Sequence, residues 1–433
     1  VPNIKFFPMK NKILLIALLL TAALSAQQTY LHCGQLFDAK SATFSGPFTI
    51  VVEGSKIVTV EKGYQYPEEE TTAVIDLKTK TVYPGFIDMH VHIESEYTPD
   101  QYLKVFQNND ADVAFEAVEF AHRTLMAGFT TVRDLGGSGV NIALRNAIEK
   151  GTITGPRIFT SGKSLATTGG HADPTNGYKK ALQGDPGPKE GVVNSVEDAK
   201  KAVRQRYKNG ADWIKITATG GVLSVAKSGQ NPQFTEEEIA AITLTAKDYG
   251  MQVAAHAHGD EGMYRAVKNG VKTIEHGTLM EQRTMDLMKS KQAYLVPTIT
   301  AGKFVAEQAK IPGAYPAIIV PKAIAIGAKI QAMFKSAYAY GVPIAFGTDA
   351  GVFPHGENAK EFIYMNEAGM PVTEALQLAT FENAKLLGQS DRLGQLAPGF
   401  MADIVATDKN AADDVNTLTL VTFVMKEGKV VKD

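Results

Sequence analysis

Apolar runs rich in β-branched residues alternate with helix-like segments through the middle of the chain. Segments such as Glu236–Tyr249 and Asp260–Asn269 are candidate helices that follow these runs. The runs are Thr81–His92, Phe129–Asp134, Arg157–Ser161, Trp213–Thr217, Gln252–His258, Lys272–His276, Ala293–Thr298 and Pro343–Asp349. Strands that alternate with helices predict an α/β fold with a parallel sheet, and eight such units predict a closed (β/α)8 barrel of the TIM type.

Both ends of the chain instead carry short β-like runs separated by turn residues. The runs are Phe48–Glu53, Lys56–Glu61 and Thr72–Leu77 at one end and Asp403–Thr407, Thr419–Met425 and Lys429–Lys432 at the other. The first two flank Gly54 and Ser55 and predict a hairpin. Because neither end is large enough to fold alone, we expect 27–82 and 394–433 to form one small β-sandwich beside a barrel at 83–393.

Two long stretches rich in glycine and proline, Gly162–Gly191 and Gly302–Pro321, follow predicted strands. In a barrel of this type the connections after the strands surround the active site. We therefore expect both stretches to lie near the mouth of a site.

The first 26 residues have the pattern of a secretory signal peptide. Lys10 and Lys12 precede the apolar run Ile13–Leu24, and small residues follow at a suitable cleavage position near Ala26. The run is too short to span the roughly 30 Å of a bilayer core, and the alternative is a buried N-terminal helix. The pattern does not explain Val1–Pro8. We expect an exported protein, periplasmic or secreted, with no membrane association in its mature form.

Composition narrows the chemistry of the protein. The 433 residues include 44 Lys and Arg against 46 Asp and Glu, and no basic cluster appears, which argues against a nucleic-acid partner. Cys33 is the only cysteine, so an internal disulfide or a CxxC metal site is excluded. The nine histidines are therefore the pool of candidate metal ligands.

Five of the nine histidines lie at the ends of predicted strands. His90 and His92 are two positions apart, so the period of a strand places both on one face, where they can share a metal ion. A single histidine at a strand end is usually a satisfied core residue, but several strands ending in this way favour a metal centre. The remaining strand ends carry His256 with His258, His276, and Asp349.

Lys215 lies between Ile214 and Ile216 in a predicted strand. A charged ammonium group there needs an acidic partner or a lowered pKa. One interpretation is a structural ion pair with a neighbouring acid. The other is a neutral amine that reacts with CO2, giving a carbamate whose two oxygens can bridge two cations.

Taken together, these motifs resemble those of the amidohydrolase superfamily. Within it the chain is similar to the prolidase-like, metal-dependent dipeptidases related to imidazolonepropionase. The resemblance covers most of the chain after the predicted signal peptide. The matching segments are PGFIDMHVH (84–92), AGFTTVRD (127–134), GPR (155–157), TGGH (168–171), IKITATGGVLS (214–224), AAHAHG (254–259), TIEHG (273–277), GTDAG (347–351) and LAPGFMADI (396–404).

The resemblance implies a centre of two divalent cations, expected to be zinc. His90, His92 and Asp349 would bind the more buried ion, and His256 and His276 the more exposed one. Lys215, as a CO2-derived carbamate, would bridge both. The superfamily places its ligand first in such a strand-end group, so His256 is assigned as the ligand, and His258 would face the substrate.

The same resemblance implies hydrolysis of the amide bond of a small dipeptide or N-acyl amino acid by a hydroxide that bridges the metals. Asp349 would carry the proton from the nucleophile to the leaving nitrogen. His171 and Tyr264 are candidate donors to the oxyanion and candidate substrate contacts. Their alternatives are a hydrogen bond that orders the loop for His171 and packing between helix and strand for Tyr264.

The sequence leaves the dipeptide specificity open and offers one other reaction class as an alternative. Relatives of this kind split between Xaa-Pro dipeptides and dipeptides ending in arginine or lysine, and the sequence does not separate them. A mononuclear deaminase or an imidazolonepropionase-like ring hydrolase is disfavoured, because such sites lack the bridging lysine and place a glutamate soon after the histidine of strand five. Here the first acid after His256 is Asp260. The full ligand set disfavours a non-catalytic scaffold, and relatives are often homo-oligomers.

Overall fold

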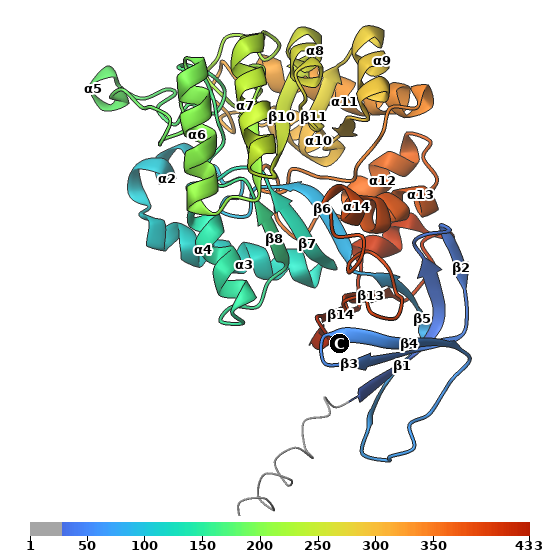
Figure 1. The fold of residues 1–433 in the computed structure, drawn as a ribbon. Helices are drawn as coiled ribbons and strands as arrows, with labels where there is room; N and C mark the ends of the chain where they lie inside the picture. The colour runs from blue at the N-terminus through green and yellow to red at the C-terminus, as the bar shows by residue number, and fades with distance from the viewer. Residues whose placement is uncertain (1–27) are drawn as a thin grey trace, which may run out of the picture.

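Strands from both ends of the chain hydrogen-bond into one sheet in the computed structural model, which describes residues 28–433 (Figure 1). The predicted signal peptide lies outside the described residues. The strand order is β15-β14-β13-β5-β1-β3-β4, with β2 paired to β1. This agrees with the expectation that the two ends combine, and β3 and β4 form the predicted hairpin. The strands are β1 (Gln28–Asp38), β2 (Thr43–Ser45), β3 (Phe48–Glu53), β4 (Lys56–Lys62), β5 (Ala73–Pro84), β13 (Ile404–Thr407), β14 (Phe423–Lys426) and β15 (Lys429–Lys432).

Seven further strands form two parallel sheets, with the orders β6-β7-β8 and β12-β11-β10-β9. They are β6 (Phe86–Val91), β7 (Phe129–Asp134), β8 (Arg157–Thr160), β9 (Trp213–Thr217), β10 (Gln252–Gly259), β11 (Thr273–Leu279) and β12 (Tyr294–Val296). Most residues of these strands are buried, as expected where helices cover a parallel sheet.

Helices connect these strands and follow them (Figure 1). They are α2 (Gln101–Gln107), α3 (Asp110–Met126), α4 (Val140–Glu149), α5 (Lys180–Gln183), α6 (Val196–Asn209), α7 (Glu236–Asp248), α8 (Asp260–Lys268), α9 (Gln282–Lys291), α10 (Ile299–Gln308), α11 (Val320–Tyr340), α12 (Lys360–Glu367), α13 (Val372–Gln377) and α14 (Asn383–Leu386). A π-helical turn, Leu378–Glu382, joins α13 to α14, and a 3-10 turn covers Val415–Thr419. No helix among the described residues is long and apolar enough to cross a membrane.

The predicted strand Thr81–His92 is divided at Gly85. The part before Gly85 is the end of β5 and pairs with β13 in the terminal sheet, whereas the part after it is β6. The backbone N–H of Gly85 donates to the carbonyl of Asp403, which ties this junction to the C-terminal segment. The prediction of one strand was therefore wrong, because two sheets share this stretch of chain.

The predicted eighth strand, Pro343–Asp349, is an extended segment with isolated bridges at its ends. Parallel bridges join Ile344 to Leu295 of β12 and Ala350 to Val91 of β6. Pro343 has no N–H to donate, and Asp349 has φ 65°, so a regular ladder is interrupted at both ends. A third bridge, between Leu165 and Ile216, joins the region after β8 to β9. The seven strands β6 to β12 thus form two open parallel sheets, separate from the terminal sheet.

Candidate active site

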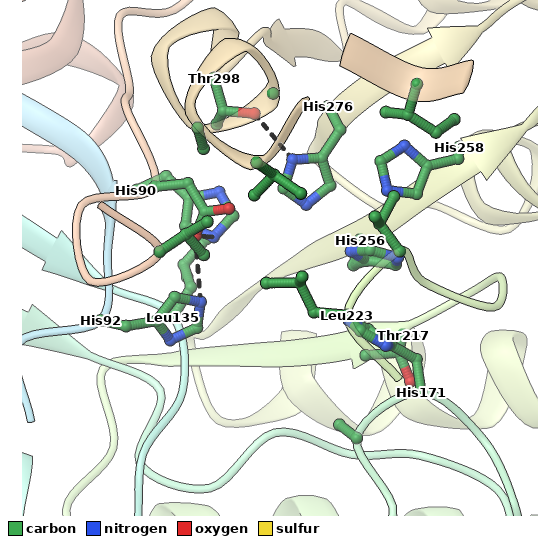
Figure 2. A pocket seen from close by; sticks show the side chains of 18 of the residues that line it. His90, His92, Leu135, His171, Thr217, Leu223, His256, His258, His276 and Thr298 are labelled. Atoms are coloured by element: carbon green, nitrogen blue, oxygen red, sulfur yellow. Dashed lines mark hydrogen bonds and ion pairs between the residues drawn. The ribbon is translucent and has the colours of Figure 1, made fainter. Parts of the chain in front are cut away.

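Two groups of three ligand-type side chains lie next to each other in one pocket (Figure 2). In each group the ligand atoms lie within 4.8 Å of one another. The rings of His90 and His276, one from each group, have centroids 5.3 Å apart. The first group is His90 of β6, His92 just after that strand, and Asp349. The second group is His256 and His258 from β10 with His276 from β11.

The first group directs three lone pairs toward one point. Nδ1 of His92 is 2.8 Å from the carbonyl oxygen of Gly136, which can only accept, so this nitrogen carries the proton. Nδ1 of His90 lies 2.9 Å from Oε2 of Glu275, so the charge of this carboxylate faces one edge of the ring. The free Nε2 atoms of His90 and His92 lie 3.4 and 3.3 Å from Oδ1 of Asp349.

Oδ1 of Asp349 is buried and receives no hydrogen bond. Burial by itself would raise the pKa of this carboxyl, but His90 and His92 outweigh it and hold the pKa below its ordinary value. A buried carboxylate oxygen beside two imidazole lone pairs is an unfavourable arrangement without a cation. The first group therefore fits a divalent metal ion with nitrogen and oxygen ligands.

The second group consists of neutral histidines. Burial lowers the pKa of His258 to about 4 and lowers those of His256 and His276 well below the ordinary value. Nδ1 of His276 is 2.7 Å from Oγ1 of Thr298, and Nδ1 of His258 is 2.9 Å from Oγ1 of Thr278. Three neutral, buried imidazoles with ligand atoms this close also fit a metal ion.

His256 is held differently from the other two. Its Nε2 is 3.1 Å from the carbonyl oxygen of Gly220, so Nε2 carries the proton and Nδ1 offers the lone pair. Its ring also stacks on His171, with centroids 4.3 Å apart. The geometry therefore brings both His256 and His258 to the site and leaves the choice between them as second-group ligand to experiment.

Lys215 of β9 lines the pocket and reaches the first group. The side chain is buried, and its Nζ lies 3.4 Å from Nε2 of His90. None of the ion pairs among residues 28–433 involves Lys215, so the interpretation as a structural ion pair is wrong. Burial lowers the pKa of this amine to about 8. The side chain is thus a buried amine with no direct ion pair, beside a candidate metal ligand and within reach of the charges of Glu275 and Asp349.

Strained backbone marks the same positions. His276, Thr298 and Asp349 have φ values of 73°, 50° and 65°, in the left-handed region that residues other than glycine rarely adopt. Two of them are candidate ligands, and the third contacts one. Such strain persists where the surrounding structure fixes it, and it concentrates at functional sites.

A buried ion pair beneath the site was missed by the sequence analysis. Arg133 of β7 donates from Nη2 to Oε1 of Glu275 at 3.0 Å, and its Nε donates to the carbonyl of Met89 at 2.6 Å. Burial opposes ionisation of Glu275, but Arg133 and His90 outweigh it and lower the pKa to about 2. Glu275 is therefore a carboxylate that fixes the orientation of His90. The only signal in the sequence is that Glu275 immediately precedes His276.

A second buried carboxylate, also missed, holds the segments that carry the ligands. Asp88 accepts hydrogen bonds from Oγ1 of Thr348 at 2.7 Å and from Nδ2 of Asn358 at 2.8 Å. It also accepts from the backbone N–H of His90 at 3.0 Å. Asp88 thereby joins β6 to the segment that ends at Asp349.

Of the two predicted oxyanion donors, one lies in the pocket and the other does not. His171 lines the pocket, and its buried Nδ1 has no hydrogen-bond partner. Tyr264 lies on α8, where its ring packs beneath the guanidinium of Arg283 at 4.8 Å, outside the pocket lining. The face of α8 that is buried instead presents Met263 and Val267. The role predicted for Tyr264 was therefore wrong.

The sequence matches the amidohydrolase family over residues 81–431. The chain belongs to this family of metal-dependent hydrolases, which act on C–N bonds. Both the resemblance inferred from the motifs and the TIM-type α/β fold are confirmed at this level.

Three relatives show how close the similarity is. Ochratoxinase from Aspergillus niger is 31% identical over 382 residues, which cover 82% of this chain and 76% of the ochratoxinase. The crystal structure of a Xaa-Pro dipeptidase with methionine bound in its active site is 50% identical, with a TM-score of 0.91, and the match covers 94% of this chain and 100% of that one. A prolidase complexed with N-methylphosphonate-L-proline is 32% identical, with a TM-score of 0.84 and the same coverage.

Proposed function

We propose that the protein hydrolyses the amide bond of dipeptides or N-acyl amino acids, with Xaa-Pro dipeptides as its first candidate substrates, at a centre of two zinc ions. The observation that carries the proposal is the convergence of two ligand groups on one pocket, with the buried amine of Lys215 beside them. The Xaa-Pro dipeptidase and the prolidase, both similar over their whole length, support the substrate class. The proposal takes the two parallel sheets and segment 343–350 as one closed ring around the site.

In this proposal each ligand group holds one cation. His90, His92 and Asp349 would hold the first, and His256 and His276 the second. Lys215 would bridge both as a carbamate, since a buried amine with a lowered pKa has the neutral fraction that reacts with CO2. When bound, such ions lower the pKa of water and polarise the carbonyl of the scissile amide.

The side chains of the protein would then position the substrate and move the proton. Asp349 would accept the proton from the attacking water and deliver it to the amide nitrogen, which is a poor leaving group until it is protonated. His171 faces the pocket with a free ring nitrogen and would contact the carbonyl oxygen of the substrate. Exclusion of water by the buried walls would strengthen each of these interactions.

The decisive experiment combines metal analysis with a dipeptide panel. Protein loaded with zinc should contain close to two ions per chain and should hydrolyse Xaa-Pro dipeptides. Lys215→Ala should lose both metal and turnover, whereas Lys335→Ala, at an exposed position on α11, should lose neither. Protein equilibrated with 13C-labelled CO2 should show a carbamate signal that is absent from Lys215→Ala. One ion per chain with full activity in Lys215→Ala would contradict the proposal and favour a mononuclear deaminase.

A further inference from the structure

One wall of the pocket is built by two helices and is entirely apolar. Its residues on α11 are spaced three and four positions apart, so they lie on one face of the helix. This wall and the two ligand groups line the same pocket. The wall consists of Ala301, Gly302 and Val305 from α10 and Ala323, Ile326 and Ile330 from α11.

The two helices pack closely enough to make this wall rigid. A Cβ atom at Gly302 would lie 2.8 Å from Cγ2 of Ile330, and one at Gly327 would lie 2.2 Å from Cβ of Ala306. Both glycines are therefore required by the close approach of α10 and α11. Because larger side chains do not fit between the helices, α10 and α11 are held in a fixed position relative to each other.

No free carboxylate faces this wall. Among the described residues Asp349 alone contributes a carboxylate to the pocket lining, and it belongs to the first ligand group. Lys322 of α11 lies nearby, but its ammonium group donates to the carbonyls of Gly221, Ser224 and Ala226 and has no hydrogen left. This clamp fixes the loop that carries Val222 and Leu223, which add further apolar surface to the pocket.

Two acids of the adjoining groove, which shares Leu223 with the pocket, are also occupied. Glu94 accepts hydrogen bonds from the backbone N–H groups of Ser138, Gly139 and Asn141 at the start of α4. Glu96 pairs with Arg123 at 2.9 Å. A basic side chain that entered the pocket would therefore find no unpaired carboxylate.

We infer that the α10–α11 wall selects substrates by an uncharged apolar side chain and rejects lysine and arginine side chains. The inference rests on the proposed function and narrows its substrate class, because it decides between the two dipeptide specificities that the sequence left open. An ammonium group buried against this wall would lose its hydration without gaining a partner. A linear aliphatic side chain of the same length would instead gain from burial of its apolar surface.

Norleucine and lysine make a matched pair for the test, because their side chains have nearly the same length and differ at the end by a methyl or an ammonium group. Zinc-loaded protein is assayed with norleucyl-proline against lysyl-proline, and with alanyl-norleucine against alanyl-lysine. In each pair that is cleaved, we expect kcat/KM for the norleucine peptide to be on the order of 100-fold higher. Equal rates, or faster cleavage of the lysine peptides, would overturn the inference while leaving the proposed function intact.

A pair of α11 variants tests whether the α10–α11 wall causes the preference for norleucine over lysine peptides. Ile326 is 7% exposed and lines the pocket, whereas Ile324 is 49% exposed on the outer surface of the same helix. Ile326→Glu should reduce the norleucine preference at least tenfold, and Ile324→Glu should leave it unchanged. An unchanged preference in folded Ile326→Glu would contradict the assignment to this wall. If Ile326→Glu does not fold, the wild-type peptide pairs still decide the inference.

Absence of cleavage for every peptide would contradict the proposed function instead. The inference then has a separate readout, since binding of norleucyl-proline and lysyl-proline to the zinc-loaded protein can be measured by titration calorimetry. Tighter binding of norleucyl-proline would support the selection by the wall. Equal or tighter binding of lysyl-proline would refute it.

Discussion

The two ligand groups of the pocket are held by different kinds of hydrogen-bond partner. In the first group, His90 and His92 contact a carboxylate and a carbonyl, which can only accept. In the second group, His258 and His276 contact threonine hydroxyls, which can donate or accept. Acceptors of this kind fix the rings of the first group, and the carbonyl of Gly220 fixes His256 in the same way. His258 and His276, in contrast, can each exchange the proton between their ring nitrogens.

This difference predicts that the two groups bind metal with unequal strength. A carboxylate that accepts from a ligating histidine fixes its tautomer and raises its basicity. The first group has this support from Glu275 and also contains the carboxylate of Asp349, whereas the second group has no charged member. We expect the first group to bind its cation more tightly, and the variants below test that comparison.

The largest effect is expected for Asp349→Asn, which removes the charge from the first group while keeping its shape. Loss of the proton-transferring carboxylate should lower kcat by about 10²- to 10⁴-fold. Asparagine keeps one oxygen ligand, so metal analysis should still find zinc in the protein. Asp248→Asn, at an exposed position near the end of α7, is the control and should keep wild-type turnover. More than a tenth of the activity left in Asp349→Asn would show that Asp349 does not move the proton.

Glu275→Gln should have the next largest effect and acts on the first group through His90. Glutamine keeps one oxygen but loses the negative charge, so zinc binding at the first group should weaken by about 10- to 100-fold. Because Arg133 also loses its charged partner, thermal stability should fall as well. Thr273→Val removes a hydroxyl that contacts both Arg133 and Oε1 of Glu275 but keeps the negative charge of Glu275 beside His90, so it separates the charge from the surrounding hydrogen bonds. If both variants weaken zinc binding equally, the charge of Glu275 beside His90 does not support the metal.

The main ligands of both groups could be predicted from the sequence. The period of a strand was sufficient to place His90 with His92 and His256 with His258, because alternate residues share a face. The parallel arrangement of the strands predicted that ligands from different strands would lie close together. Lys215 could be placed in the same way, and the structure then removed the ion-pair interpretation.

The parts that could not be predicted depend on contacts between distant positions. Arg133 and Glu275 are 142 residues apart, and no local pattern links them. Tyrosine is a residue type suited to catalysis. On α8, however, Met263 belongs to the buried face, and the next residue, Tyr264, already lies outside that face beside Arg283. The stretch Gly302–Pro321 was predicted as a connection near the mouth of the site. Its glycines argued against a helix, but its first part belongs to α10.

Removal of zinc with a chelator compares the metal affinities of the two ligand groups directly, and the expected difference is smaller than the effects above. Stepwise treatment of the zinc-loaded protein with a chelator should release one ion before the other, with dissociation constants that differ by about tenfold or more. The ion that leaves first should belong to the second group, so its loss should occur at the same chelator concentration in wild type and in Glu275→Gln. The ion that leaves last should leave earlier in that variant. Release of both ions in one step from the wild type would contradict unequal binding.

The smallest effect is expected for the threonines of the second group, and it identifies the ligands there. Thr298→Val keeps the branched shape of the side chain but removes the hydroxyl that contacts Nδ1 of His276. Loss of one such hydrogen bond, about 1 kcal/mol, should weaken zinc binding at the second group by roughly fivefold. Thr278→Val makes the matching change beside His258 and should have less effect if His256 is the ligand. A larger effect of Thr278→Val would assign His258 as the ligand, because only a hydroxyl that orients a bound imidazole can alter metal affinity.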